Sequence, residues 1–290
     1  MNIGFVGLGV MGFPMAGHLQ AGGHSVRVYN RTKDKAIRWV QRYGGELGST
    51  PSDVANGADL VCLCVGNDDD VLKVTMSQDG VLAGLPAGGV IIDHTTASAE
   101  LARQLSADAA KCGVMFLDAP VSGGQAGAEK GALTIMVGGD RTIFDRIEPV
   151  LQNYAKCVKL LGPVGSGQLA KMVNQICIAG VIQGLSEALT FSEKVGLNTS
   201  AVMEVVSQGA AQSWQMDNRH RTMVAGEYDH GFAVDWMRKD LAMILAQAGK
   251  LGLELPITSL VDGYYREVQE MGGARWDTSS LYARMVARDI

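Results

Sequence analysis

The feature that most constrains the fold of this chain is a glycine pattern near its start, between two short apolar segments. The apolar segments are Asn2 to Val6 and Ser25 to Tyr29, and a helical segment that ends at about Ala21 precedes the second. The glycine pattern reads Gly7-Leu8-Gly9-Val10-Met11-Gly12. In a strand-helix-strand unit, such glycines allow a tight turn, a close approach of the backbone to a pyrophosphate, and close packing of helix on strand.

The helix after the glycines points its N-terminus at the same place, where unpaired N–H groups and the helix dipole favour an anion. Strand, glycines, helix and second strand come in the order that this site requires. We therefore predict a doubly wound α/β domain that binds a dinucleotide. The alternative is a turn with a purely structural role.

The end of the second apolar segment indicates which dinucleotide is bound. An NAD site usually has an acidic residue there, which accepts a hydrogen bond from the ribose 2′-hydroxyl. This chain has Asn30-Arg31-Thr32 instead. Arg31 can pair with a 2′-phosphate, and Asn30 and Thr32 can donate hydrogen bonds to it. The pattern favours NADP, although a solvated Arg31 would leave NAD possible.

Five more segments are expected to be strands: Asp59 to Val65, Gly89 to Asp93, Met115 to Asp118, Ala132 to Val137 and Val158 to Leu161. Ligands of such sheets bind beyond the carboxyl ends of the strands. We therefore expect Val65, which ends the first of these segments, and Gly66 and Asp70, which follow it, in the cofactor site. The acidic run at Asp68 to Asp70 is expected to open the next helix rather than to bind a metal.

Ser122-Gly123-Gly124 follows the strand that ends at Asp118. A hydroxyl beside exposed backbone N–H groups can hold a carboxylate. The alternative is a tight loop that needs glycines with positive φ.

A glycine-rich turn at Gly162 to Gly167 leads into a helical segment that carries Lys171 and Asn174. Residues three apart share a helix face, so an ammonium and an amide lie together there. Up to this point strands and helices alternate, and after it the chain is helical. We therefore predict a dinucleotide-binding domain over residues 1–161 and an all-helical substrate and dimerisation domain over residues 162–290, including a long inter-domain helix over 168–195.

The long helix is apolar on more than one face, so its own domain and a second subunit are expected to bury it. We therefore expect a homodimer or homotetramer. The best candidate for a membrane span, Ile176 to Leu189, is interrupted by Gln183 and Glu187, so no membrane contact is expected. Lys239-Asp240 lies in a later helix, where an ion pair on the surface is the simplest interpretation.

Composition excludes several other classes. The net charge of -5 with both signs mixed argues against a nucleic-acid partner. The five cysteines have no metal-ligand spacing, and their odd number suits reduced thiols. A strand that begins at Asn2 leaves no room for a signal peptide. We expect a cytoplasmic protein without a metal.

With these motifs assembled, the chain resembles the β-hydroxyacid dehydrogenase family, which includes 3-hydroxyisobutyrate dehydrogenase, tartronate semialdehyde reductase and glyoxylate/succinic semialdehyde reductases. The resemblance covers the full length and depends on GLGVMG, DAPVSGG, GSGQLAKMVN and the late Lys239-Asp240. It implies that Lys171 is the catalytic lysine, that Ser122, Gly123 and Gly124 hold the substrate carboxylate, and that Asn174 orients the substrate. It also implies that Thr96 lies near the nicotinamide ribose and that Lys239 reaches the cofactor.

Two departures from the family pattern concern the nicotinamide side. Val65-Gly66 replaces a frequent Leu-Pro, and Thr95-Thr96 replaces Ser-Thr. Asn30-Arg31-Thr32 is closer to the NADPH-using semialdehyde reductases, and Lys171 argues against the related imine reductases, which generally lack it.

The leading hypothesis is an NADP-dependent oxidoreductase that interconverts a small 3-hydroxy acid and its semialdehyde, with Lys171 as general acid and base. One alternative is an NAD-dependent 3-hydroxyisobutyrate or serine dehydrogenase. Another, of a different class, is a non-catalytic dinucleotide-binding sensor.

Overall fold

The computed structural model describes residues 1–287 of the chain. It forms two compact units, Met1–Lys171 and the part from Met172 onward. The division falls inside the long helix α9 (Ser166–Lys194), whose first turns therefore belong to the first unit.

The first unit is built on a sheet of strand order β3-β2-β1-β4-β5-β6-β8-β7, with β9 beside β8. Strands β1 to β6 pair in parallel, β8 is antiparallel to β6 and β7, and β9 is parallel to β8. The strands are β1 (Asn2–Val6), β2 (Ser25–Tyr29), β3 (Glu46–Leu47), β4 (Leu60–Leu63), β5 (Val90–Asp93), β6 (Met115–Asp118), β7 (Val121–Ser122), β8 (Leu133–Gly138) and β9 (Ala155–Gly162).

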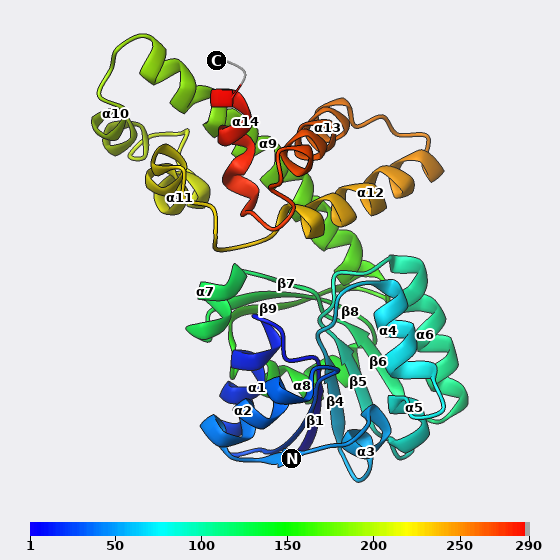
Figure 1. Cartoon of the computed structure of the whole chain (residues 1–290). Helices are drawn as coiled ribbons and strands as arrows, with labels where there is room; N and C mark the ends of the chain where they lie inside the picture. Colours follow the sequence, from blue (N-terminus) through cyan, green and yellow to red (C-terminus); the bar gives the residue numbers. More distant parts are fainter. Residues whose placement is uncertain (288–290) are drawn as a thin grey trace. The chain divides into compact units, whose positions relative to one another are not determined.

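Helices cover both faces of this sheet (Figure 1). One core packs α1, α2 and α8 against the sheet, and a second core packs α3 to α6 against the other face. The helices of this unit are α1 (Gly12–Ala21), α2 (Lys33–Tyr43), α3 (Pro51–Ala55), α4 (Asp68–Met76), α5 (Val81–Gly84), α6 (Ala99–Lys111), α7 (Gly124–Glu129) and α8 (Arg141–Leu151). The predicted doubly wound α/β fold is confirmed, with strand order reversing between β1 and β4.

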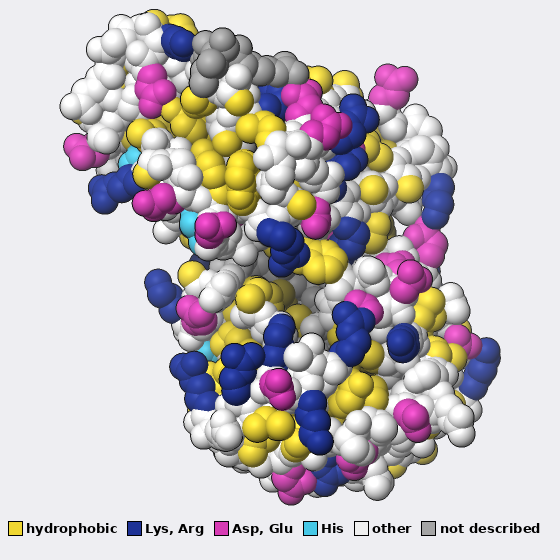
Figure 2. Space-filling view, viewed as in Figure 1, with side chains coloured by type: hydrophobic (Ala, Val, Ile, Leu, Met, Phe, Trp, Pro, Cys, Tyr) yellow, Lys and Arg dark blue, Asp and Glu magenta, His cyan; other side chains and the backbone are white. Residues whose placement is uncertain are grey.

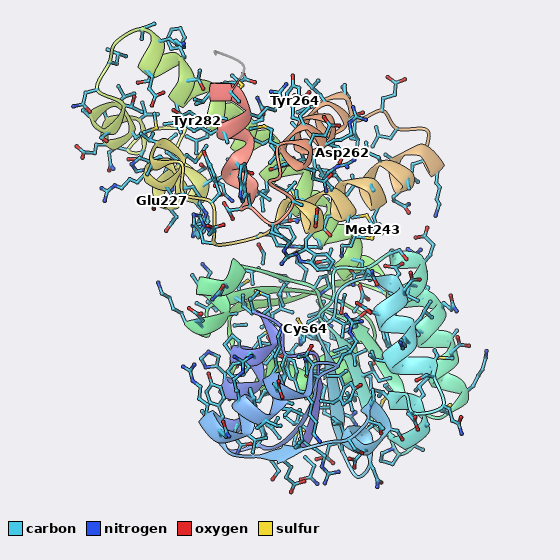
Figure 3. The ribbon with its side chains drawn as sticks, viewed as in Figure 1. Cys64, Glu227, Met243, Asp262, Tyr264 and Tyr282 are labelled. Carbon is cyan, nitrogen blue, oxygen red and sulfur yellow. The ribbon has the colours of Figure 1, made fainter. Side chains whose placement is uncertain are left out.

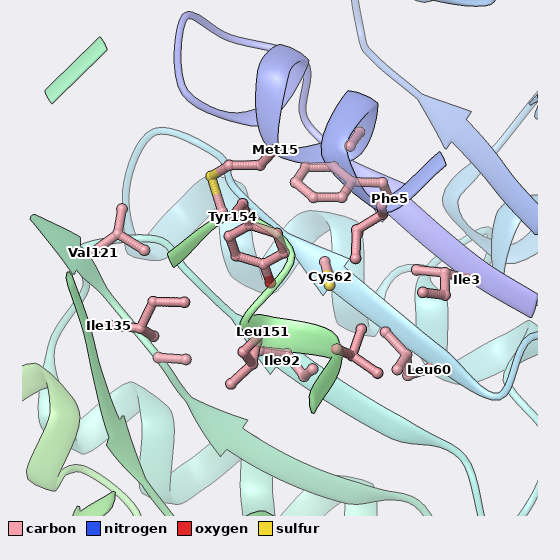
Figure 4. Close-up of a cluster of buried hydrophobic side chains, with 14 of the residues drawn as sticks. Ile3, Phe5, Met15, Leu60, Cys62, Ile92, Val121, Ile135, Leu151 and Tyr154 are labelled. Atoms are coloured by element: carbon pink, nitrogen blue, oxygen red, sulfur yellow. The ribbon is translucent and has the colours of Figure 1, made fainter. Parts of the chain in front are cut away.

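The strands β4 and β5 lie in the middle of the sheet and consist mostly of apolar residues. Every residue of β4 and β5 is buried, as expected for strands covered by helices on both faces. Figure 4 shows the core on the α1 side, where the Tyr154 hydroxyl lies near Cys62 of β4. Burial raises the pKa of the Cys62 thiol to about 12, so this thiol stays protonated.

The second unit is helical. Besides the rest of α9, it contains α10 (Thr199–Val206), α11 (Trp214–Ala225), α12 (Val234–Lys250), α13 (Pro256–Glu270), the short 3₁₀ turn η1 (Thr278–Ser280) and α14 (Leu281–Ala287). Leu185 and Leu189 of α9 pack in one core with methionines of α10 and α11 and with Tyr282 of α14. Residues 288–290 of the predicted helical domain lie outside the described residues.

Helix α9 is long and apolar enough to pass a length and composition test for a membrane span, as core helices of soluble proteins also do. Its most apolar window is 44% buried inside the structure. Among the described residues, one face of the helix is buried, with Ala179, Ile182 and Leu189, and another is exposed, with Val173, Val181 and Phe191.

Candidate functional site

The glycine loop between β1 and α1 has the backbone that the sequence pattern requires. Gly7 has a φ of +100°, and a Cβ there would collide with the carbonyl oxygen of Cys64. A Cβ at Gly12 would collide with the carbonyl oxygen of Gly7, so helix and loop are in close contact. A Cβ at Gly9 would meet nothing within 4 Å, so this part of the loop presents open backbone. These three features fit the pyrophosphate of a dinucleotide.

Asn30 joins this loop to the end of β2. Its side-chain oxygen accepts a hydrogen bond from the Leu8 N–H at 2.9 Å, and its amide nitrogen donates to the Thr32 carbonyl at 2.9 Å. Asn30 therefore holds the loop in place by local bonds, a role that the sequence pattern did not indicate. Val10 at the turn is 61% exposed.

Arg31 and Asp70 meet although 39 residues separate them. Arg31 donates to the Asp70 carboxylate at 3.1 Å, and the Arg31 side chain is 79% exposed. Asp70 lies in the first turn of α4, where the Asn67 side chain caps its N–H. The acidic run thus opens a helix, as predicted. An exposed ion pair of this kind contributes less than about 1 kcal/mol, so Arg31 can exchange Asp70 for another anion at little cost.

The segment after β5 is tied to the end of β4. The Thr95 hydroxyl accepts from the Val65 N–H at 3.0 Å, and the Thr95 N–H donates to the buried Asp93 carboxylate at 2.9 Å. Burial raises the pKa of Asp93 to about 7, with hydrogen bonds from Thr95 opposing it. Cys64, labelled in Figure 3, precedes Val65 at this place.

Asp118 anchors the start of α9 to the end of β6. Its carboxylate accepts from the Gly165 N–H at 2.7 Å and from the Gln168 N–H at 2.9 Å. A Cβ at Gly167 would collide with the Met136 carbonyl oxygen, so the helix start lies directly on β8. Burial raises the pKa of Asp118, and the bonds from the helix N–H groups lower it. Asp118 belongs to the recognised DAPVSGG motif, but this capping role was not foreseen.

Ser122 lies in β7, opposite Thr134 of β8. Gly123 and Gly124 have φ values of +129° and +60°. The backbone therefore requires glycine at both positions. This supports the structural explanation for the two glycines, and it leaves the carboxylate role of the loop as a prediction.

Lys171 is 7% exposed and is the last residue of the first unit, within α9. In the second unit, a series of polar contacts begins at Asn174, three residues after Lys171. The Asn174 amide donates to Gln175 at 2.8 Å, Gln175 donates to the Asp240 carboxylate at 2.7 Å, and Lys239 pairs with Asp240 at 3.2 Å. Asp240 is 1% exposed, so this pair is not the surface ion pair that spacing alone suggested.

His94 is buried and has a structural position. Its ring nitrogens lie 2.7 Å from the Ala119 carbonyl oxygen and 2.9 Å from the Tyr154 hydroxyl. Burial lowers the pKa of His94 to about 4. Within residues 1–287, no group of three or more His, Cys, Asp or Glu side chains is arranged to hold a metal ion.

Side chains of both charge signs are scattered over the face seen in Figure 2. Several residues predicted for the cofactor site are hydrogen-bonded within the first unit. Leu8 bonds to Asn30, and Arg31 bonds to Asp70. Val65 bonds to Thr95, which precedes Thr96. Lys239 lies in the second unit, beside Asp240.

Two family models match the chain. Residues 2–162 match the NAD binding domain of 6-phosphogluconate dehydrogenase. Residues 165–285 match the model described as NAD-binding of NADP-dependent 3-hydroxyisobutyrate dehydrogenase. Together these models cover the sheet and the helices of both units.

Individual proteins are similar over the same length. An uncharacterized oxidoreductase of Shewanella frigidimarina is 59% identical over 284 residues, which are 98% of this chain and 98% of that protein. The 2-hydroxy-3-oxopropionate reductase of Escherichia coli is 32% identical over 97% of this chain and 96% of its own. The crystal structure of 3-hydroxyisobutyrate dehydrogenase from Salmonella typhimurium has a TM-score of 0.87 at 28% identity, covering 97% of this chain and 98% of that one.

The glycine loop, the strand order, the helical second unit and these full-length similarities agree with one another. They support a nicotinamide dinucleotide as the cofactor of an oxidoreductase. The chain therefore belongs to the β-hydroxyacid dehydrogenase family of NAD(P)-dependent oxidoreductases.

Proposed function

We propose that this protein uses NADP to interconvert a small 3-hydroxy acid, of the size of 3-hydroxyisobutyrate or glycerate, and the matching semialdehyde. The observation that carries the proposal is the placement of Lys171. This lysine is almost fully buried, in a helix whose first turn is anchored by the Asp118 carboxylate. A buried ammonium is costly, and it is expected where chemistry requires a proton donor.

Lys171 is the proposed general acid in reduction and the general base in oxidation. A bound nicotinamide supplies or accepts the hydride at the carbon that bears the substrate oxygen. In reduction, the Lys171 ammonium donates a proton to that oxygen, and its charge stabilises the alkoxide that develops. In oxidation, the Lys171 amine removes the proton from the substrate hydroxyl. Ser122 with the N–H groups of Gly123 and Gly124 would hold the substrate carboxylate, and Asn174 would orient the oxygen.

Arg31 is the proposed contact for the 2′-phosphate of NADP, with Thr32 beside it. Its exposure and its weak ion pair with Asp70 support this role, because the guanidinium is available to a second anion. The remaining proposed cofactor contacts are Val65, Gly66, Asp70, Thr96 and Lys239. A homo-oligomer in the cytoplasm remains our expectation for the assembly and its location.

One observation favours an NAD-dependent enzyme as the second candidate. The Asp70 carboxylate lies beside Arg31, and a carboxylate there can accept a hydrogen bond from a ribose 2′-hydroxyl. In that case Arg31 would orient Asp70 and would not meet a phosphate.

The test is turnover with NADPH and NADH on tartronate, methylmalonate and succinic semialdehydes and glyoxylate, with the hydroxy acids tested in reverse. We expect NADPH-dependent reduction of a small semialdehyde. NADH-dependent turnover would select the second candidate. Tight NADPH binding without turnover on any compound would indicate a sensor.

Replacing Lys171 tests the mechanism. We expect Lys171→Met to lower kcat by roughly 10²- to 10⁴-fold, because the positioned proton donor is lost. The dissociation constant of NADPH should stay within about two-fold, since the cofactor contacts remain. Lys156→Met, at an exposed lysine in β9, is the matched control and should keep wild-type turnover. Normal turnover by Lys171→Met would refute the proposed role.

A further inference from the structure

A buried glutamine in the first turn of α9 bonds to two other segments of the first unit. Gln168 is 1% exposed and lies three residues before Lys171, on the same helix face. Its side-chain oxygen accepts from the Ala97 N–H at 3.0 Å, and its amide nitrogen donates to the Thr95 carbonyl at 2.7 Å. Its own backbone N–H donates to Asp118.

The Gln168 side chain makes its two hydrogen bonds to the residues on either side of Thr96. Thr95 and Ala97 flank Thr96, which is the proposed contact of the nicotinamide ribose. A planar carboxamide that bonds a carbonyl on one side of Thr96 and an N–H on the other fixes the backbone of that residue. The segment has further anchors at Val65 and Asp93, so it has little freedom to move relative to the sheet.

The same residue belongs to the helix turn that carries Lys171. A shift of Gln168 would therefore move the proton donor and the Thr96 segment together. A reaction that needs a hydride and a proton at neighbouring atoms depends on such registration, and a misplacement of about 1 Å can cost about 100-fold in rate.

We propose that Gln168 is a positioning residue, which holds the Thr96 segment in register with Lys171. The inference rests on the proposed function of Lys171 and Thr96. Glutamine suits the position because one side chain must accept from Ala97 and donate to Thr95. Leucine can do neither, and an ionised glutamate can only accept.

Three variants separate this role from simple packing. Gln168→Leu removes both bonds, and Gln168→Glu retains only the acceptor while its carboxylate is ionised. Gln183→Leu is the matched control, because Gln183 is also buried on α9 but donates to Glu187 of the same helix. All three are measured for kcat, KM, the primary isotope effect with deuterated NADPH, and melting temperature.

We expect Gln168→Leu to lower kcat by about 10- to 100-fold and to raise the isotope effect, because hydride transfer becomes slower. Gln183→Leu should retain the wild-type kcat, even if its melting temperature falls as much as that of Gln168→Leu. Equal kcat in the two variants, per folded molecule, would overturn the inference.

Gln168→Glu adds a readout that packing alone would not change. Burial raises the pKa of the introduced carboxyl, and once protonated it both accepts and donates, as glutamine does. Its kcat relative to wild type should therefore recover as the pH is lowered, whereas that of Gln168→Leu should not. This variant also preserves side-chain volume, so it remains informative if Gln168→Leu does not fold. A constant ratio to wild type at all pH values would count against the proposed donor bond.

Two measurements do not depend on turnover. Hydrogen exchange of the Ala97 amide, in the protein without cofactor or substrate, should accelerate in Gln168→Leu but not in Gln183→Leu. The dissociation constant of NADPH should rise by about 3- to 10-fold in Gln168→Leu, because the Thr96 segment that is proposed to contact the cofactor would no longer be held in place. A wild type without turnover would refute the proposed function, whereas unchanged exchange and affinity in Gln168→Leu would refute the positioning role.

Discussion

Arg31 and Asp70 are an arginine and a carboxylate at one corner of the proposed adenosine site, and their contact predicts how cofactor preference can be shifted. With NADPH the 2′-phosphate would compete with Asp70 for the guanidinium. We expect Arg31→Ala to raise the dissociation constant of NADPH by about 10-fold or more, because a charge-assisted contact is lost. The dissociation constant of NADH should change by less than about two-fold.

Asp70→Asn is the complementary variant. It removes the competing charge, so NADPH should bind more tightly while Arg31 is present. Fluorescence titration with both cofactors measures each constant. Equal loss of NADPH and NADH affinity in Arg31→Ala would mean that Arg31 supports the loop and does not contact the phosphate.

Asp93 and His94 are adjacent buried residues whose ionisations act on stability in opposite directions. Asp93 has its pKa raised from 3.8 to about 7, so between these values the native state binds a proton that the unfolded chain lacks. Its contribution to stability therefore grows as the pH falls from 7 to about 4. His94 has its pKa lowered from 6.5 to about 4, so its contribution is complete above pH 6.5 and is lost as the pH falls towards 4.

Asp93→Asn should remove the first of these effects. The free energy of unfolding of this variant, relative to wild type, should fall by about 3 to 4 kcal/mol between pH 7.5 and pH 4. Urea denaturation of the cofactor-free protein at several pH values measures the difference. A difference that is independent of pH would show that Asp93 is ionised in the native state over this whole range.

The role of a single residue can be predicted from the sequence where it depends only on neighbouring residues in the chain. The glycines at positions 7, 9 and 12 were assigned their tasks from spacing alone, because those tasks are local to one turn. Asp118 and Gln168 were within recognised motifs, but their partners lie up to 73 residues away. Asn30 was expected to meet the cofactor, and in the structure it bonds to Leu8 and Thr32.

At the scale of elements, the long helix α9 has one face that residues 1–287 leave exposed. Exposed apolar side chains recur along it at intervals typical of one helix face. They are Val173, Cys177, Val181, Phe191 and, just past its end, Val195. Gly184 lies on the same face, and a Cβ there would meet nothing within 4 Å. This stripe is the expected contact with a second copy of the chain.

Val181→Glu tests the stripe by placing a charge at its centre. We expect light scattering to show a shift from an oligomer towards the mass of one chain, 30.7 kDa, because the carboxylate would be buried without a partner. Val205→Glu alters an equally apolar, exposed position on α10 and should leave the mass unchanged. An unaltered oligomer in Val181→Glu would exclude this face as the contact.

Element boundaries followed from local signals where those were strong. The predicted strands from Asn2 to Val6 and from Ser25 to Tyr29 agree with β1 and β2. The two-residue strands β3 and β7 were not predicted, since pairing with longer neighbours defines them and their own residues do not. Helix α14 follows a 3₁₀ turn in which the Asp277 side chain accepts a hydrogen bond from the Ser279 N–H.

At the scale of the whole molecule, the order of elements was enough to predict a doubly wound sheet followed by helices. Alternating apolar strands and helices permit few other arrangements. The chemistry of the site was less accessible, because the proposed catalytic lysine depends on bonds from β6 and from the segment after β5. Spacing placed Lys171 on a helix, but spacing alone does not reveal which buried groups hold that helix.

The division of α9 between the two units has a consequence for protein engineering. The residues from Gly165 to Lys171 complete the hydrogen bonds of Asp118, Thr95 and Ala97, which all lie in the sheet unit. A chimera joined at the end of the last strand would give these partners an unrelated helix start, and Thr95 and Ala97 would lose their hydrogen bonds to the Gln168 side chain. A chimera joined after Lys171 would keep them. The helical half is therefore exchangeable as a module only beyond that lysine, and recombination between related enzymes should tolerate crossovers there.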